Sequence, residues 1–93
     1  MKIDYTTLSY LLRGKRRQIV FLALESKPKT PKQLAKECNI SISNISVSLA
    51  ELVRTGFVKC ITPNEKFFRF YELTEKGKEA AKQLREYTGK THN

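Results

Sequence analysis

The chain has 93 residues and a net charge of +9 at pH 7, from 18 Lys and Arg against nine Asp and Glu. Its length suffices for one domain that folds without a metal or a disulfide, and its charge makes a polyanion, nucleic acid first, the expected partner. The longest apolar run, Ile19 to Leu24, is far shorter than the roughly 20 residues of a membrane span, and no signal peptide is recognisable, so we expect a cytoplasmic protein without a membrane partner.

Residues 1–14 are predicted to form a helical extension before the main domain, which we place at 15–88. Leu8, Leu11 and Leu12 share one helical face, and Gly14 is a stop signal. The next segment is predicted to turn an apolar set toward the interior: Ile19, Val20, Leu22, Ala23 and Leu24.

The pattern leaves open whether the helix is continuous through Gly14. If it is broken there, three cations occupy the first turn of a new helix: Lys15, Arg16 and Arg17. Cations in that position oppose the helix dipole at about 0.3–1 kcal/mol each, a cost that a bound anion would offset. If the helix is continuous, they lie mid-helix and the penalty vanishes.

A second helix is predicted to follow "KPKTP". Pro28 ends the preceding segment, Thr30 with Gln33 has the spacing of a capping box, and Pro31 suits the first helical position. Its interior face carries Leu34, Ala35 and Cys38. Asn39 tolerates the left-handed backbone of a tight turn, and Ser41 or Ser43 is expected to cap the next helix.

The segment "NISISNISVSLAEL", residues 39–52, begins with the alternation of a strand. If it were a strand, neither of its two faces would be apolar. As a helix it gathers one apolar stripe: Ile42, Ile45, Leu49, Leu52 and Val53. Gly56 then provides a C-terminal stop. We therefore predict a helix, whose outward side carries Ser43, Asn44, Val47, Glu51 and Arg54, with Ser46 and Ser48 on the flanks.

After Gly56 the period changes. "FVKCIT" and "FFRFYELT" are predicted strands of a hairpin that turns at "PNEK". Tyr71 and Leu73 are assigned to the core, whereas Phe68 and Phe70 are either covered by the N-terminal segment and last helix or part of a subunit interface. A last helix begins after the cap Thr74, and its expected inner face comprises Ala80, Ala81, Leu84 and Tyr87 or Thr88. Residues 89–93 form a polar tail.

This order of elements resembles the winged helix-turn-helix family, and the local sequence is similar to its ArsR and MarR-type transcription regulators. The resemblance spans roughly Lys15 to Leu84. Ala35 meets the small position of the helix-turn-helix pattern and Ile45 its β-branched core position, while Asn39 stands where Gly is usual. "YELTEKG" is similar to the second wing strand running into the last helix. The implied fold class is α+β, mainly helical, with a two-stranded wing and a C-terminal helix.

The resemblance implies a sequence-preferring regulator of double-stranded DNA, with the helix from about Ser43 to Thr55 in the major groove and the wing on the backbone. Short polar side chains suit close approach to base edges. Expected base contacts come from Ser43, Asn44, Val47 and Ser48, with Asn44 suited to adenine and Val47 to a thymine methyl. Expected backbone contacts are Lys15, Arg16, Arg17, Lys32, Lys36, Ser41, Ser46, Arg54, Lys66 and Arg69.

Family resemblance further implies a homodimer and a palindromic operator. The alternative is a winged-helix module that binds protein or RNA in a larger assembly, using Phe68, Phe70 and the last helix. No enzyme or cofactor is expected, because one terminal His and four Gly supply no catalytic set. Cys38 and Cys60 are too isolated for a zinc site and are expected to be buried reduced thiols. His92, in the polar tail, has no expected role.

Overall fold

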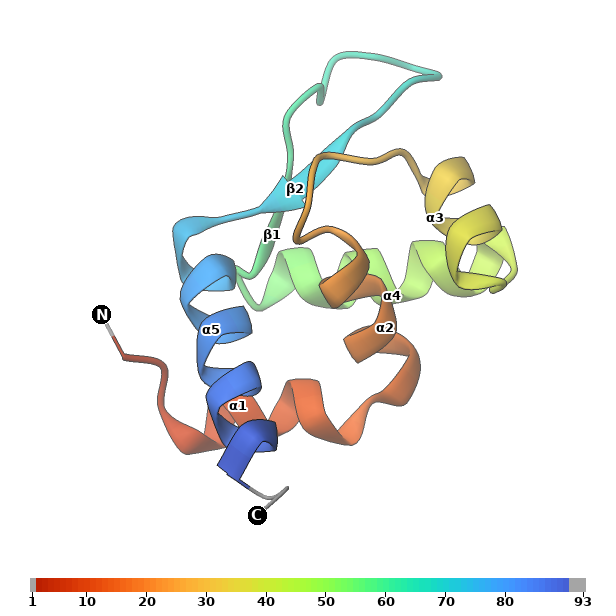
Figure 1. The fold of residues 1–93 in the computed structure, drawn as a ribbon. Coiled ribbons are helices and arrows are strands. Elements are labelled where there is room, and N and C mark those ends of the chain that lie inside the picture. Colours follow the sequence, from red (N-terminus) through yellow and green to blue (C-terminus); the bar gives the residue numbers. More distant parts are fainter. Residues whose placement is uncertain (1, 91–93) are drawn as a thin grey trace.

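The computed structural model describes residues 2–90, with side chains described as far as residue 86. Five helices and one two-stranded sheet follow one another in the predicted order (Figure 1). Their bounds are α1 Tyr5–Arg13, α2 Lys15–Ala23, α3 Pro31–Cys38, α4 Ile42–Arg54, β1 Val58–Cys60, β2 Tyr71–Leu73 and α5 Glu75–Lys90. Helix α5 thus continues past residue 88, where the sequence analysis ends the domain. The rest of the polar tail, with His92, lies outside the described residues. Within residues 2–90, no helix has both the length and the apolar character needed to cross a bilayer.

Gly14 breaks the N-terminal helical region into two helices. Its backbone is extended, with φ −96° and ψ 95°, and it serves both as the C-terminal cap of α1 and as the N-terminal cap of α2. The question left open by the sequence is therefore answered: Lys15, Arg16 and Arg17 occupy the first turn of α2, which contains no acidic residue.

The inner face of α2 differs from the one predicted. Phe21 is fully buried together with Val20 and Leu24, whereas Ile19 and Leu22 are exposed. Residues three and four apart lie on the same side of a helix. The buried side is therefore set by positions 20, 21 and 24, and including Ile19 and Leu22 made the predicted face too wide.

The helix–turn–helix is bounded by the predicted local signals. Thr30 Oγ1 accepts from the backbone N–H of Gln33, and Gln33 Oε1 accepts from that of Thr30, which completes the capping box of α3. Asn39 adopts the left-handed conformation, with φ 56° and ψ 47°. Of the two serines offered as the next cap, Ser41 takes that position, and its Oγ accepts from Asn44 N–H at 3.2 Å.

The segment that begins with strand-like alternation is a helix, α4. Ile45, Leu49 and Leu52 are buried, which confirms the central part of the predicted stripe. The ends of the stripe are wrong, because Ile42 is 51% and Val53 43% exposed. Helix α4 ends at Arg54 with Thr55 as its C-terminal cap, and Gly56 follows with φ +85°, a backbone conformation that glycine adopts without strain.

The wing is shorter in regular pairing than predicted. Val58 pairs with Leu73 and Cys60 with Tyr71 in antiparallel register, and residues 61–70 form a loop. The α2–α3 connection joins the other edge of β2, because Lys29 and Tyr71 exchange backbone hydrogen bonds of 3.0 and 2.9 Å. Leu73 is buried and Tyr71 packs partly against the core, as expected.

Phe68 and Phe70 are covered neither by the N-terminal segment nor by the last helix. Phe68 is 71% exposed, and both residues border a hollow beside α3 that is also lined by Thr30, Lys32, Gln33 and Lys36. The first of the two arrangements offered by the sequence is therefore wrong. The wing loop lies on the side of α3 rather than back over the body of the domain (Figure 1), and both rings line the hollow there.

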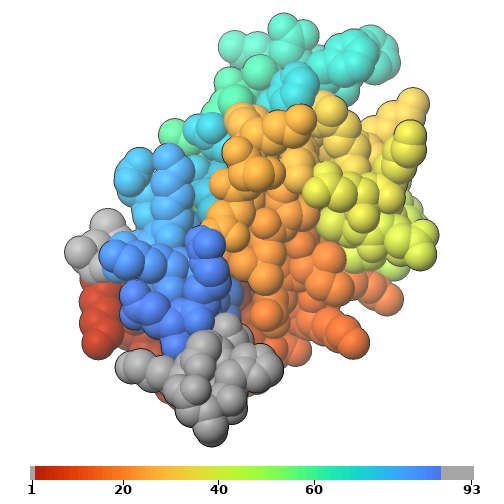
Figure 2. Space-filling model, viewed as in Figure 1, coloured from red at the N-terminus to blue at the C-terminus, as the bar shows by residue number. Residues whose placement is uncertain are grey.

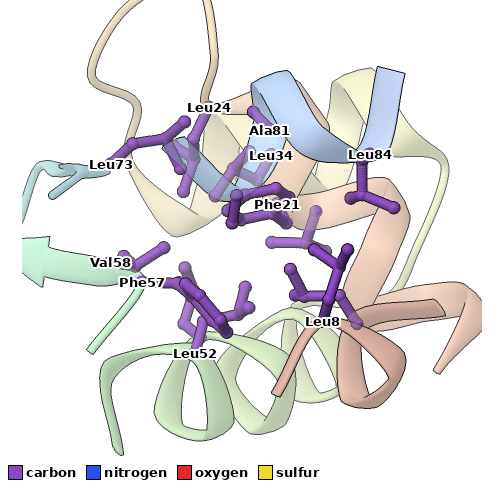
Figure 3. Close-up of a cluster of buried hydrophobic side chains, with 14 of the residues drawn as sticks. Leu8, Phe21, Leu24, Leu34, Leu52, Phe57, Val58, Leu73, Ala81 and Leu84 are labelled. Atoms are coloured by element: carbon purple, nitrogen blue, oxygen red, sulfur yellow. The ribbon is translucent and has the colours of Figure 1, made fainter. Parts of the chain in front are cut away.

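One hydrophobic core joins all the helices and the sheet (Figure 3). At its centre Phe21 of α2 and Phe57, just before β1, meet edge to face with ring centroids 5.8 Å apart. Leu8 and Leu11 of α1 belong to the same core, as do Ala80, Ala81 and Leu84 of α5. The predicted N-terminal extension therefore packs as part of the domain. The expected fourth position of the α5 face, Tyr87 or Thr88, lies outside the described side chains.

Two long-range links position α5. Gln83 accepts from the backbone N–H of Ile3 at 2.6 Å and donates to its carbonyl at 3.1 Å, which holds the N-terminal segment against the helix. Gly77 lies against the Phe57 carbonyl so closely that a Cβ would overlap it. The helix therefore approaches the start of the wing only because residue 77 is glycine.

Candidate nucleic-acid interface

The outward face of α4 consists of side chains that project away from the core on successive turns. These residues are all exposed: Ser43, Val47, Ala50 and Arg54. Val47 is 58% exposed, so this aliphatic side chain contributes little to the core. The first three side chains are short, so a ligand surface can approach the helix backbone closely. Ala50 belongs to this face by its spacing of seven residues from Ser43, a signal that the sequence analysis missed.

Ser48 does not belong to the outward face. It is only 3% exposed and lies on the buried side of α4. It follows Ile45 by three residues and precedes Leu52 by four, and residues so spaced share a helix face. The prediction that Ser48 contacts a base edge is therefore wrong, and the spacing alone could have shown it.

A groove runs along one flank of α4, where it meets the start of α2. Its volume is about 650 Å³, and its walls are Gly14–Arg17 and Ile19 from α1–α2, Cys38–Ile40 from the turn, and Asn44, Val47, Ser48 and Glu51 from α4. The first turn of α2, where the helix dipole is positive, forms part of these walls. Lys15 and Arg16 are exposed there, while Asn44 is half-buried. Burial raises the pKa of the Cys38 thiol in the groove wall above its usual range.

Arg17 is engaged within the protein. Its Nη1 donates to the Tyr10 carbonyl at 2.6 Å, its Nε lies 3.2 Å from Glu51 Oε1, and its guanidinium stacks 3.7 Å from the centre of the Tyr10 ring. These contacts satisfy the end of α1 and bind it to α4. The prediction that Arg17 contacts the DNA backbone is not supported, since its side chain is mostly buried in this arrangement.

The other predicted backbone contacts lie on the surface. Lys32 and Lys36 are exposed on α3, Ser46 and Arg54 on α4, and Lys66 on the wing. Arg69, also on the wing, is exposed, and its Nε donates to the Glu65 carbonyl at 2.9 Å. Ser41 is exposed while it caps α4. These groups come from α3, α4 and the wing.

One lysine that the sequence analysis did not single out has a structural task. Lys29 is 5% exposed, and its Nζ donates to the Ala23 carbonyl at the end of α2 and to Glu37 Oε1 of α3, at 2.6 and 2.7 Å. It joins the two helices across the connecting segment. Among the described residues, no three His, Cys, Asp or Glu side chains gather closely enough to hold a metal ion.

Comparisons with known proteins find similarity to bacterial regulatory proteins in both sequence and structure. The model of the bacterial regulatory protein, arsR family, matches residues 13–59, half of the chain. Reduced HlyU from Vibrio cholerae is similar in structure with a TM-score of 0.71 and 25% identity, over 85% of this chain and 81% of HlyU. A ZitR variant from Lactococcus lactis gives 0.69 and 25% over 82% of this chain, which spans only 52% of ZitR.

The homodimeric winged helix-turn-helix DNA-binding domain of Mb0332 from Mycobacterium bovis, described as a possible ArsR-family transcriptional regulator, has a TM-score of 0.72. Its identity is 16%, over 94% of this chain and 79% of the domain. A comparison with curated protein sequences finds no significant match. Together the structural likenesses confirm the predicted winged helix-turn-helix fold.

Proposed function

Because the chain belongs to the arsR family of bacterial regulatory proteins, we propose that it binds double-stranded DNA with sequence preference, with α4 in the major groove and the wing on the flanking backbone. Family and fold make it a DNA-binding transcription regulator, and they also confirm the expectation that it is not an enzyme. The assignment of side chains to bases or to phosphates rests on their exposure and their position around α4.

The observation that carries the proposal is the outward face of α4, where short side chains and one exposed valine follow one another on a helix of a strongly basic chain. The major groove admits an α-helix. The base edges there include the donor and acceptor of adenine, which match an amide side chain, and the thymine methyl group. We assign base contact to Ser43, Asn44 and Val47. Ala50 adds a small residue that lets the next turn of the helix approach.

Backbone contact is proposed for cationic and hydroxyl groups around α4. The set is Lys15, Arg16, Lys32, Lys36, Ser41, Ser46, Arg54, Lys66 and Arg69. The net charge of +9 and the absence of acidic residues from the first turns of α2, α3 and α4 favour approach of phosphates to these helix ends.

A salt titration tests this electrostatic part. Duplex affinity measured by fluorescence anisotropy should fall with a log–log slope of about −5, as expected if about six phosphates are neutralised. Counterion release makes that slope a property of phosphate contact rather than of sequence. A slope near zero, or no binding at low salt, would remove the proposal.

We also propose a homodimer formed through α1 and α5. The two helices lie at the same end of the domain, away from the wing (Figure 1), and α1 carries Tyr5, whose side chain is 67% exposed. The Mb0332 domain of the same fold is homodimeric. Two-fold symmetry would match a palindromic site. A monomeric mass by light scattering at micromolar concentration would contradict this arrangement.

Selection of bound duplexes from a random pool tests sequence preference directly. The wild-type protein should select a palindromic site. Asn44→Ala should change the selected sequence, because it removes a side chain assigned to a base edge, while Lys66→Ala should weaken binding to all sequences alike, because a phosphate contact carries no sequence information. The assignment of Asn44 fails if both variants select the wild-type site.

A further inference from the structure

The wing tip carries two neighbouring aromatic rings that the fold leaves uncovered. Phe67 is 81% and Phe68 71% exposed, more than any other large apolar side chain in the described part of the chain. Figure 2 shows the tip, coloured teal to cyan, at the top of the molecule next to α3. Two adjacent phenylalanines in water contribute nothing to the core, so their position calls for a partner.

Hydrogen bonds hold the tip in a defined shape. Thr62 Oγ1 accepts from the backbone N–H of Phe70 at 2.9 Å and donates to the Phe68 carbonyl at 3.0 Å. Ile61 N–H donates to the Phe70 carbonyl at 2.8 Å, and Arg69 Nε donates to the Glu65 carbonyl at 2.9 Å. Beyond the three-residue strands, one backbone hydrogen bond and the side-chain bonds of Thr62 and Arg69 therefore hold the loop, so the two rings are presented by a preorganised segment.

The surroundings of the rings are cationic. Lys66 and Arg69 flank the pair in sequence, and Lys32 and Lys36 of α3 line the hollow of about 440 Å³ that Phe68 borders. Glu65 is the one acidic residue of the described loop between Ile61 and Phe70. An apolar tip with cations on the neighbouring loop residues and on α3 complements a surface that is negative outside and apolar within. The stacked bases of DNA, reached between two phosphate backbones, are such a surface.

We propose that Phe67 and Phe68 form an apolar wedge that enters the minor groove beside the major-groove site, parts one base step and bends the duplex. The inference rests on the proposed DNA-binding function and assigns a specific action to the wing. Phenylalanine is among the side chains that minor-groove proteins insert between base steps, and the resulting kinks are about 20–90°. Lys66 and Arg69 hold the flanking phosphates while the rings reach the bases.

The test uses the full chain and a duplex of about 30 base pairs with a central TA step, a flexible step that is easily unstacked. Donor and acceptor dyes at the two ends report bending, and anisotropy reports affinity. Wild-type protein should increase energy transfer at saturation. Phe67→Ala/Phe68→Ala should bind about tenfold more weakly and leave the duplex nearly straight. The melting temperature of the variant protein should match that of the wild-type protein, since both rings are exposed.

Lys66→Ser is the matched control in the same loop. It should weaken binding and reduce the magnitude of the salt slope by about one, as loss of one phosphate contact requires, while the bend remains. The wedge is refuted if wild-type protein binds the duplex without bending it, or if the double alanine variant bends it equally. In that case the rings serve another partner and the major-groove proposal stands. No duplex binding by the wild type at low salt would instead refute the proposed function itself.

Discussion

Replacing Phe57 by alanine is expected to lower the free energy of unfolding by about 3–5 kcal/mol. The side chain is fully buried, next to Leu52 of α4 and Val58 of β1 (Figure 3). Its ring contacts Phe21 of α2 edge to face, and Nζ of Lys76 in α5 lies 5.1 Å from the centre of the Phe57 ring. Removing the ring leaves a cavity that this packing cannot close, since the backbone on either side is fixed.

The fixed backbone follows from hydrogen bonds at Phe57 itself. Its N–H donates to the Leu52 carbonyl and its carbonyl accepts from Thr74 N–H, each at 3.0 Å. Those bonds hold the residue between the end of α4 and the start of α5. Because small domains are stable by only about 5–15 kcal/mol, the variant should be close to unfolding at 25 °C.

Urea unfolding followed by circular dichroism measures the effect, and Phe68→Ala provides a matched control. The chemical change is the same, but Phe68 is exposed, so its loss should alter the free energy of unfolding by no more than about 0.5 kcal/mol. Similar losses at the two positions would show that the core does not depend on Phe57 as described.

The element boundaries were predictable because their signals are local. Thr30 with Gln33, Asn39 and Gly56 each specify a cap or turn through atoms within a few residues, and the structure places all of them as the sequence indicates. The helical nature of α4 was predictable for a similar reason, since its apolar stripe fits one period and not the other.

The choice of face within a helix was less predictable. Ile19 and Leu22 are apolar but exposed, because α2 packs on its neighbours through Val20, Phe21 and Leu24. Composition does not distinguish such residues, and only the helical spacing of the whole set does. Ser48 shows the converse case, in which a hydroxyl side chain lies within the buried stripe.

Contacts between distant segments could not be read from the pattern at all. Arg17 reaches Tyr10 and Glu51, Lys29 reaches Ala23 and Glu37, and Gln83 pairs with Ile3, 80 residues away in the chain. A charged or amide side chain looks the same in sequence whether it faces solvent or another helix. Arg17 was therefore assigned to DNA on its charge, whereas the fold uses it to join α1 to α4.

Replacing Val47 by aspartate should weaken duplex binding by about a hundredfold, or roughly 2.7 kcal/mol. Val47 is at the centre of the outward face of α4, and a carboxylate there would meet the negative field of the groove without a cation to compensate it. The fold should be unaffected, because the valine is exposed and the two residues have similar helix propensity.

The control is Ser26→Asp, which changes the net charge by the same amount. Ser26 is exposed beside β2 and α5, in a hollow lined also by Glu72, Leu73 and Lys78. The added charge there should lower affinity only slightly, through the overall field of the protein. Comparison of the two variants thus separates the position of the charge from its amount.

Anisotropy titration of the wild type, Val47→Asp and Ser26→Asp against one duplex, at one low salt concentration, tests most directly whether α4 enters the groove. We predict that Ser26→Asp binds within about threefold of the wild type while Val47→Asp loses about two orders of magnitude, with both variants folded by circular dichroism. Equal binding by the two folded variants would contradict the account, because the outward face of α4 would then lie away from the DNA.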